Sequence, residues 1–321
     1  MTVSFSVAAK AVFSLLILIM IGFYAAKIGV IDKTMSKQLS KMIVSVAQPF
    51  MLFRALINVT YSKAHLISGL QTLGIALLSH AIFALFAFLS AHYIRNNKTE
   101  RILTEYAITF ANAGFMGFPL VEALFGDMGL FRGAFYVFAF NLSIWSYGML
   151  LLARGQDKNT DGERISVSPL KMFFNHGTVP CMVGFLFYIL QIKLPLPVAQ
   201  GVTYMNNICT PIVLLVIGAN LSRLPLKKIF LDLQLYFFSF LRLLAAPCLI
   251  ALIYHLCGME DSLVIFFCVM AALPSASMSV MFAEIYDMRP DYAAKTVGIS
   301  TLLSMFTIPV AVLLCDLILK I

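Results

Sequence analysis

The segment Phe110–Pro119 reads Phe-Ala-Asn-Ala-Gly-Phe-Met-Gly-Phe-Pro and lies in the middle of a long apolar stretch. A second apolar stretch contains Ala-Leu-Pro-Ser-Ala-Ser at Ala272–Ser277. Each stretch is long enough to cross a bilayer, yet each contains residues that break a helix halfway. Unpaired backbone groups are costly in hydrocarbon, so such breaks persist only where protein or a wet cavity supplies partners. Together the two breaks predict a binding site.

The composition around these segments is that of a membrane protein. Of 321 residues, 61% are hydrophobic and 12% are charged, and the mean hydropathy is +0.92. A soluble domain has about a quarter of its residues charged. We therefore predict an all-α polytopic membrane protein with ten transmembrane helices. The expected spans are residues 6–28, 34–57, 66–93, 102–125, 130–153, 171–191, 196–221, 231–256, 261–285 and 292–319.

The distribution of basic residues predicts the orientation of these spans. The odd-numbered connections hold sixteen Lys and Arg residues, whereas the opposite side, counting both termini, holds six. Because cytoplasmic loops are enriched in Lys and Arg, we expect the odd loops to be cytoplasmic and both termini to lie outside. This bias also explains the net charge of +8. Lipid headgroups are expected partners of these residues, and nucleic acid is not, because no basic cluster is interleaved with stacking aromatics.

Neither a cofactor nor a metal is predicted. The six cysteines have no paired spacing and fall in or beside apolar runs, which is typical of buried free thiols. They are Cys181, Cys209, Cys248, Cys257, Cys268 and Cys315. No zinc-protease motif and no Gly-x-Ser-x-Gly elbow occurs, so we do not expect an enzyme.

The chain repeats at a fixed interval. Pro49 precedes Pro211 by the same number of positions by which Asn112 precedes Pro274, and we call this spacing the repeat interval. We expect a first five-helix repeat at residues 1–154, a cytoplasmic linker at 155–168 and a second repeat at 169–321. Since five is odd, the second repeat must have the opposite topology, which is the inverted-repeat plan of secondary transporters.

The repeat gives the two breaks a chemical meaning. Each break falls near the bilayer midplane, so the second half-helices start at one depth and run to opposite sides. Their N-terminal ends bring two partial positive charges of about half a unit each to one place, which favours an anion. The residue types fit this role, because they offer an amide, hydroxyls and open backbone. The expected substrate-binding residues here are Asn112, Gly114, Pro274, Ser275 and Ser277. For one break alone, a kink that satisfies its own backbone is the better reading; the symmetric pair favours a site.

At these residues the chain resembles the auxin efflux carrier family. The matching segments are residues 112–120, 272–286 with 289–291 downstream, 300–309, 46–49, 144–145 with 150–152, and 242–247. This family includes plant auxin exporters and bacterial permeases described for malate and malonate. The resemblance covers nearly the whole chain, and the order and spacing of its motifs are more specific than any one of them.

The resemblance implies a homodimer with crossing broken helices 4 and 9. Helices 1, 2, 6 and 7 form a scaffold, and helices 3–5 and 8–10 form a moving transport unit. Asn112 matches an Asn that contacts the substrate carboxylate in plant members, but Ala111 replaces the preceding Pro. Asn141 stands where plant members have a Gln near the substrate, and the long cytoplasmic loop is missing. These departures favour the organic-acid branch.

Arg242 lies near the middle of the eighth span, where a charge is expensive, so it must face protein or water. Two readings stay open: it attracts the anion, or it pairs with an acidic neighbour. The predicted function is an elevator-type secondary transporter of small carboxylates, such as malate or malonate, in a bacterial inner membrane with periplasmic termini. An anion channel and an auxin-like monocarboxylate exporter are the alternatives. The substrate and the coupling ion are not determined by the sequence.

Overall fold

The computed structural model describes residues 5–94, 97–156, 170, 173–224, 231–286 and 288–320. Residues 157–168, most of the expected linker, lie outside the described residues. The described chain is helical, apart from short connections and an isolated antiparallel bridge between Ala111 and Ser275.

The described part of the first half contains ten helical elements. They are α1 (Phe5–Lys27), α2 (Lys33–Met42), η1 (Ile43–Ala47), α3 (Gln48–Ile57), α4 (Lys63–Ala91), α5 (Lys98–Thr109), η2 (Ala113–Gly117), α6 (Phe118–Ser143), η3 (Ile144–Gly148) and α7 (Met149–Gly155). The η elements are π-helical turns, which recur at functional sites. Three of these helices begin at a residue whose side chain caps the helix. The side-chain oxygens of Asp32, Ser62 and Asn97 each accept a hydrogen bond from the backbone N–H three residues later in the chain.

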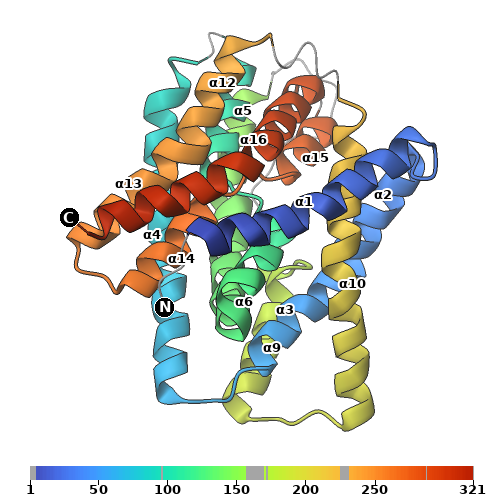
Figure 1. The fold of residues 1–321 in the computed structure, drawn as a ribbon, viewed down its shortest axis with the longest axis vertical. Coiled ribbons are helices and arrows are strands. Elements are labelled where there is room, and N and C mark those ends of the chain that lie inside the picture. The colour runs from blue at the N-terminus through green and yellow to red at the C-terminus, as the bar shows by residue number, and fades with distance from the viewer. Residues whose placement is uncertain are drawn as a thin grey trace.

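The described part of the second half contains eight elements. They are α9 (Thr178–Leu190), α10 (Leu196–Leu221), α12 (Leu233–Phe240), η4 (Leu241–Ala245), α13 (Ala246–Leu256), α14 (Asp261–Ala271), α15 (Met278–Ile285) and α16 (Pro290–Ile318). In Figure 1, α1 and α16 run obliquely past each other on the near side, and α10 packs along α1.

Within the described residues, seven helices are long and apolar enough to cross a membrane. They are residues 6–27, 33–57, 63–91, 113–155, 196–221, 233–256 and 290–318. The shorter apolar helices α9 and α14 fall on the expected sixth and ninth spans. The chain is therefore an integral membrane protein, and the helical segments follow the expected spans to within a few residues, except for the sixth, where α9 begins later than expected.

The helix over residues 113–155 contains the expected boundary between the fourth and fifth spans. Gly126 has φ 61° and ψ −147°, so the backbone leaves the helical conformation at this residue. Glycine tolerates a positive φ that a side chain would disfavour. The direction of the chain changes at Gly126, and the loop expected at 126–129 is reduced to this turn.

Two glycines bring α1 and α10 into backbone contact. A Cβ added at Gly218 would collide with the Ile19 carbonyl oxygen, and one added at Gly22 would collide with the Leu215 carbonyl oxygen. Small residues at helix crossings are typical of membrane proteins, where packing replaces the hydrophobic effect as the source of association. α1 and α10 therefore form one tightly packed pair.

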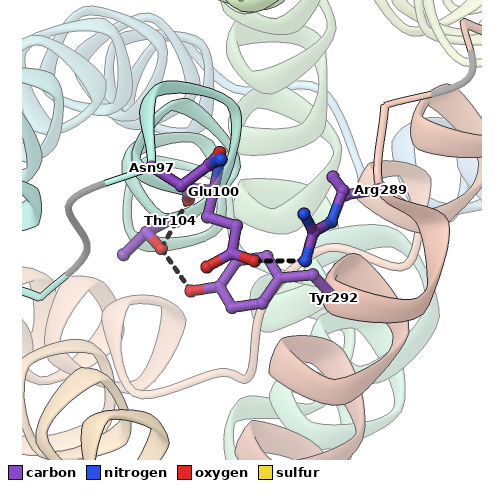
Figure 2. Close-up of polar contacts among 5 residues, drawn as sticks. All are labelled: Asn97, Glu100, Thr104, Arg289 and Tyr292. Atoms are coloured by element: carbon purple, nitrogen blue, oxygen red, sulfur yellow. Dashed lines mark hydrogen bonds and ion pairs between the residues drawn. The ribbon is translucent and has the colours of Figure 1, made fainter.

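The N-terminal ends of α5 and α16 are joined by polar contacts (Figure 2). Arg289 Nη2 lies 2.7 Å from Glu100 Oε1, and the hydroxyls of Thr104 and Tyr292 are 2.6 Å apart. Arg289 adopts the left-handed conformation with φ 50°. Helices from the two halves of the chain are thus tied together at one end.

Candidate functional site

The two broken segments cross and hydrogen-bond to each other. Asn112 N donates to the Pro274 carbonyl oxygen at 2.8 Å, and Ala276 N donates to the Phe110 carbonyl oxygen at 2.9 Å. These bonds satisfy backbone groups that the breaks would otherwise leave unpaired in hydrocarbon. Both apolar segments are interrupted, and the two interruptions lie side by side.

The first break needs no proline. α5 ends at Thr109, Asn112 has φ −77° and ψ 56°, and η2 begins at Ala113. Met116 N and Gly117 N both donate to the Asn112 carbonyl oxygen, at 3.0 and 3.1 Å, which starts the wide turn of η2. The chain therefore re-enters a helix directly after Asn112.

The second break is held by serine side chains. α14 ends at Ala271 and α15 begins at Met278. Ser275 Oγ donates to the Ala107 carbonyl oxygen on α5 at 2.8 Å, and Ser275 N donates to Ser300 Oγ on α16 at 3.2 Å. Ser275 therefore fastens the second break to both neighbouring helices.

Asn112 and Ser277 meet across the crossing. Asn112 Nδ2 donates to Ser277 Oγ at 3.2 Å. Asn112 is 5% exposed and Ser275 is fully buried. Asn112 and Ser275 therefore face protein, whereas Ser277 is half-buried.

Gly114 lies against α3, and Gly117 lies against the second break. A Cβ added at Gly114 would be 2.6 Å from Gln48 Nε2, and one added at Gly117 would be 3.0 Å from Leu273 Cδ1. The absence of a side chain at Gly114 lets the amide of Gln48 approach the backbone of η2. Gln48 was not among the expected site residues, although it belongs to the matching segment 46–49.

Asn141 lies apart from these contacts. Its Nδ2 donates to the Val137 carbonyl oxygen at 2.8 Å within α6, and its side chain packs against Gly177. No described contact joins Asn141 to Asn112, so its role near the substrate stays a prediction.

Arg242 contacts the second break at the end of α14. It is fully buried in η4, and its Nη1 donates to the Ala271 carbonyl oxygen, the last of α14, at 2.8 Å. Its guanidinium also lies 5.9 Å from the centre of the Phe83 ring. Among the described residues no carboxylate pairs with Arg242, so the acidic-neighbour reading finds no support there.

An apolar seam separates the crossing from α1. Met116 and Leu120 face Val12 and Leu16 of α1 across a cavity of about 10 Å³, with Met305 of α16 completing the lining. Within the described part of the chain, no polar side chain lines this seam.

Comparison with known proteins decides the class. The profile of the family described as membrane transport protein matches residues 7–312. The chain belongs to this membrane transport family. It is accordingly a transporter and not an enzyme, and the resemblance to the auxin efflux carriers is confirmed.

Three proteins are similar to this chain over most of their length. An uncharacterized transporter of Methanothermobacter thermautotrophicus is 26% identical over 94% of this chain and 96% of its own. An uncharacterized transporter of Methanocaldococcus jannaschii is 23% identical over 91% and 94%. A Rhizobium meliloti protein named "Putative malonate transporter" is 24% identical over 72% of each chain.

Proposed function

We propose that this chain is a secondary transporter that carries small organic anions, of the malate and malonate type, through the crossing of its two broken helices. The observation that carries the proposal is the hydrogen-bonded crossing at Asn112 and Pro274. Helix N-terminal turns carry uncompensated N–H groups and partial positive charge, which favour a carboxylate. Asn112 adds an uncharged amide at the same place.

The proposed architecture has ten spans in two inverted five-helix repeats. Support comes from the repeat interval, which relates the two residues joined at the crossing. α1, α2 to α3, α9 and α10 would form the scaffold, and the remaining helices would form the transport unit. In this reading the tight α1–α10 pair belongs to the scaffold, and the apolar seam lies between scaffold and transport unit.

An elevator motion fits the closed state of the crossing. Because Asn112 and Ser275 face protein, binding and release require the transport unit to move relative to the scaffold. An apolar seam offers little resistance to such sliding. We further propose a homodimer in a bacterial inner membrane with both termini outside, on the basis of the family and the Lys and Arg distribution.

Uptake into proteoliposomes tests this function. The purified protein is reconstituted and given labelled malonate, malate, acetate and an auxin-type indole carboxylate. We expect saturable uptake of a small dicarboxylate that is stimulated by the same unlabelled compound on the opposite side. Single-channel current steps in planar bilayers would instead establish the channel alternative, and preference for the indole carboxylate would establish the auxin-like one.

A further inference from the structure

Arg242 supplies a permanent positive charge at the broken end of α14. Ala271, whose carbonyl oxygen accepts from Arg242 Nη1, is the last residue of that helix. The C-terminal end of a helix carries partial negative charge. In secondary transporters with broken helices, such ends and unwound carbonyls are where coupling cations bind. Here a guanidinium already lies at that position.

The opposite repeat presents a histidine at the corresponding place. His80 precedes Arg242 by one repeat interval, the spacing that also relates Asn112 to Pro274. It lies on α4, is 4% exposed, and its ring centre is 6.0 Å from that of Phe110, the residue directly after α5. His80 and Arg242 therefore stand beside the ends of the two first half-helices.

The hydrogen bonding of His80 leaves one ring nitrogen available. Its Nδ1 lies 2.6 Å from the Ala76 carbonyl oxygen, which can only accept, so Nδ1 carries the proton. Nε2 is buried and has no hydrogen-bond partner among the residues that the structure describes. With the proton on Nδ1, Nε2 keeps a lone pair that can accept a second proton.

The surroundings of His80 contain no competing carboxylate among the described residues. The titratable and charged groups near it are Arg242 from η4 and Tyr136 from α6, whose ring centre lies 5.4 Å away. Tyr254 from α13 bonds to the adjacent Ser79 at 2.6 Å. The Tyr136 hydroxyl and two guanidinium nitrogens of Arg242, Nε and Nη2, also lack partners in the described part of the chain. Unpaired buried polar atoms of this kind call for a functional or solvation role.

We propose that His80 Nε2 binds the coupling proton of this transporter and that Arg242 replaces a metal cation at the end of α14. The inference rests on the proposed function. In each cycle one N–H bond forms at Nε2 with a proton from water on one side of the membrane, and that bond breaks to return the proton to water on the other. Transport is therefore driven by a pH gradient and is indifferent to sodium.

The test uses proteoliposomes containing the full chain and labelled malonate. We expect an inwardly directed proton gradient to stimulate uptake by the wild-type protein, with about tenfold greater accumulation per pH unit for each extra proton moved. A sodium gradient should have no effect. His80→Gln should lose the stimulation by the proton gradient while keeping measurable malonate counterflow. His255→Gln, a change at a half-buried histidine on α13, should behave as the wild type.

Glu105 is the rival proton acceptor. It is buried on α5 and accepts a 2.7 Å hydrogen bond from Tyr147. If Glu105→Gln loses the stimulation and His80→Gln keeps it, the proposal is overturned. Stimulation by a sodium gradient would overturn it as well.

A substrate-free measurement separates this inference from the proposed function. Thermal unfolding of the wild-type protein in detergent is compared in sodium chloride and choline chloride, since a bound ion raises the unfolding temperature. We expect equal temperatures. A higher unfolding temperature in sodium chloride would refute the proposal that Arg242 replaces a metal cation, whether or not the protein carries malonate. Absence of uptake of every carboxylate under all gradients would refute the proposed function instead.

Discussion

The backbone nitrogen of Asn112 and the carbonyl oxygen of Pro274 lie 2.8 Å apart and are joined by a hydrogen bond between the two halves of the chain. Each residue stands at the break of its own helix, and a second backbone bond, from Ala276 N to the Phe110 carbonyl oxygen, lies beside this one. The side chain of Asn112 remains available for other contacts and reaches Ser277. The backbone bond does not involve the Asn112 side chain, so a change of that side chain leaves the bond in place.

Asn112→Ala should abolish specific carboxylate flux without unfolding the protein. The backbone bond to Pro274 survives the change, whereas the amide that we propose for the substrate is lost. A fall of at least about tenfold in flux, equivalent to about 1.4 kcal/mol, is expected in proteoliposomes. Asn207→Ala, at an exposed position of α10, is the matched control. Wild-type flux in Asn112→Ala would argue directly against the site.

Pro274→Ala should slow transport. Alanine restores a backbone N–H and tolerates helical dihedrals, so α14 can extend through the break. The initial rate of uptake measures the effect, and Pro197→Ala, an exposed proline in the first turn of α10, controls for general effects of proline removal. An unchanged rate would show that the break does not depend on this ring.

Ser275→Ala should lower the stability of the crossing. The change removes the hydrogen bond to the Ala107 carbonyl oxygen, which is buried, and an unmade bond of this kind costs about 1 to 3 kcal/mol. The unfolding temperature in detergent is the readout. Ser14→Ala, which removes a local bond at an exposed position of α1, should change the unfolding temperature little.

Tyr292→Phe should destabilise the protein more than Arg289→Gln does. The hydroxyl of Tyr292 bonds to Thr104 in a buried position, while the Arg289 side chain is 59% exposed in its ion pair with Glu100. Exposed ion pairs contribute about 0 to 1 kcal/mol and weaken with salt. Unfolding temperatures at low and high salt distinguish the two, and a larger, salt-sensitive loss in Arg289→Gln would contradict this ranking.

Gly218→Leu should separate α1 from α10. Any Cβ at this position meets the backbone of Ile19, which cannot move away as a flexible side chain would. We expect poor recovery of folded protein by size-exclusion chromatography. Gly201→Leu, where nothing lies within 4 Å of an added Cβ, is the matched control. Equal recovery of the two variants would show that the helix pair adapts.

The helical segments and their breaks were predictable because they depend on local chemistry. Apolar length set the spans, and Asn, Gly and Pro marked the two interruptions. A boundary at residues 126–129 was expected, but its reduction to a turn at Gly126 was not, because a glycine between two apolar runs is equally compatible with a longer loop.

The partners of the site residues were less predictable, because they come from distant helices. The sequence gives no sign that the backbone N–H of Ser275 donates a hydrogen bond to the hydroxyl of Ser300. Similarly, a single histidine on an apolar span is usually a packing residue. The proximity of His80 to Arg242 and Phe110, seen only in the structure, is what suggests the proposed role in proton binding. The repeat interval was the one sequence signal that could have linked His80 with Arg242.

Among the six cysteines, Cys257 alone is exposed, Cys248 is half-buried and the other four are buried. Cys257 follows α13 in the connection to α14, which the Lys and Arg distribution assigns to the external side. A maleimide that cannot cross the membrane should therefore react with the Cys257 thiol when it is added to intact cells. The natural chain thus carries its own reporter of sidedness, with no engineered tag needed.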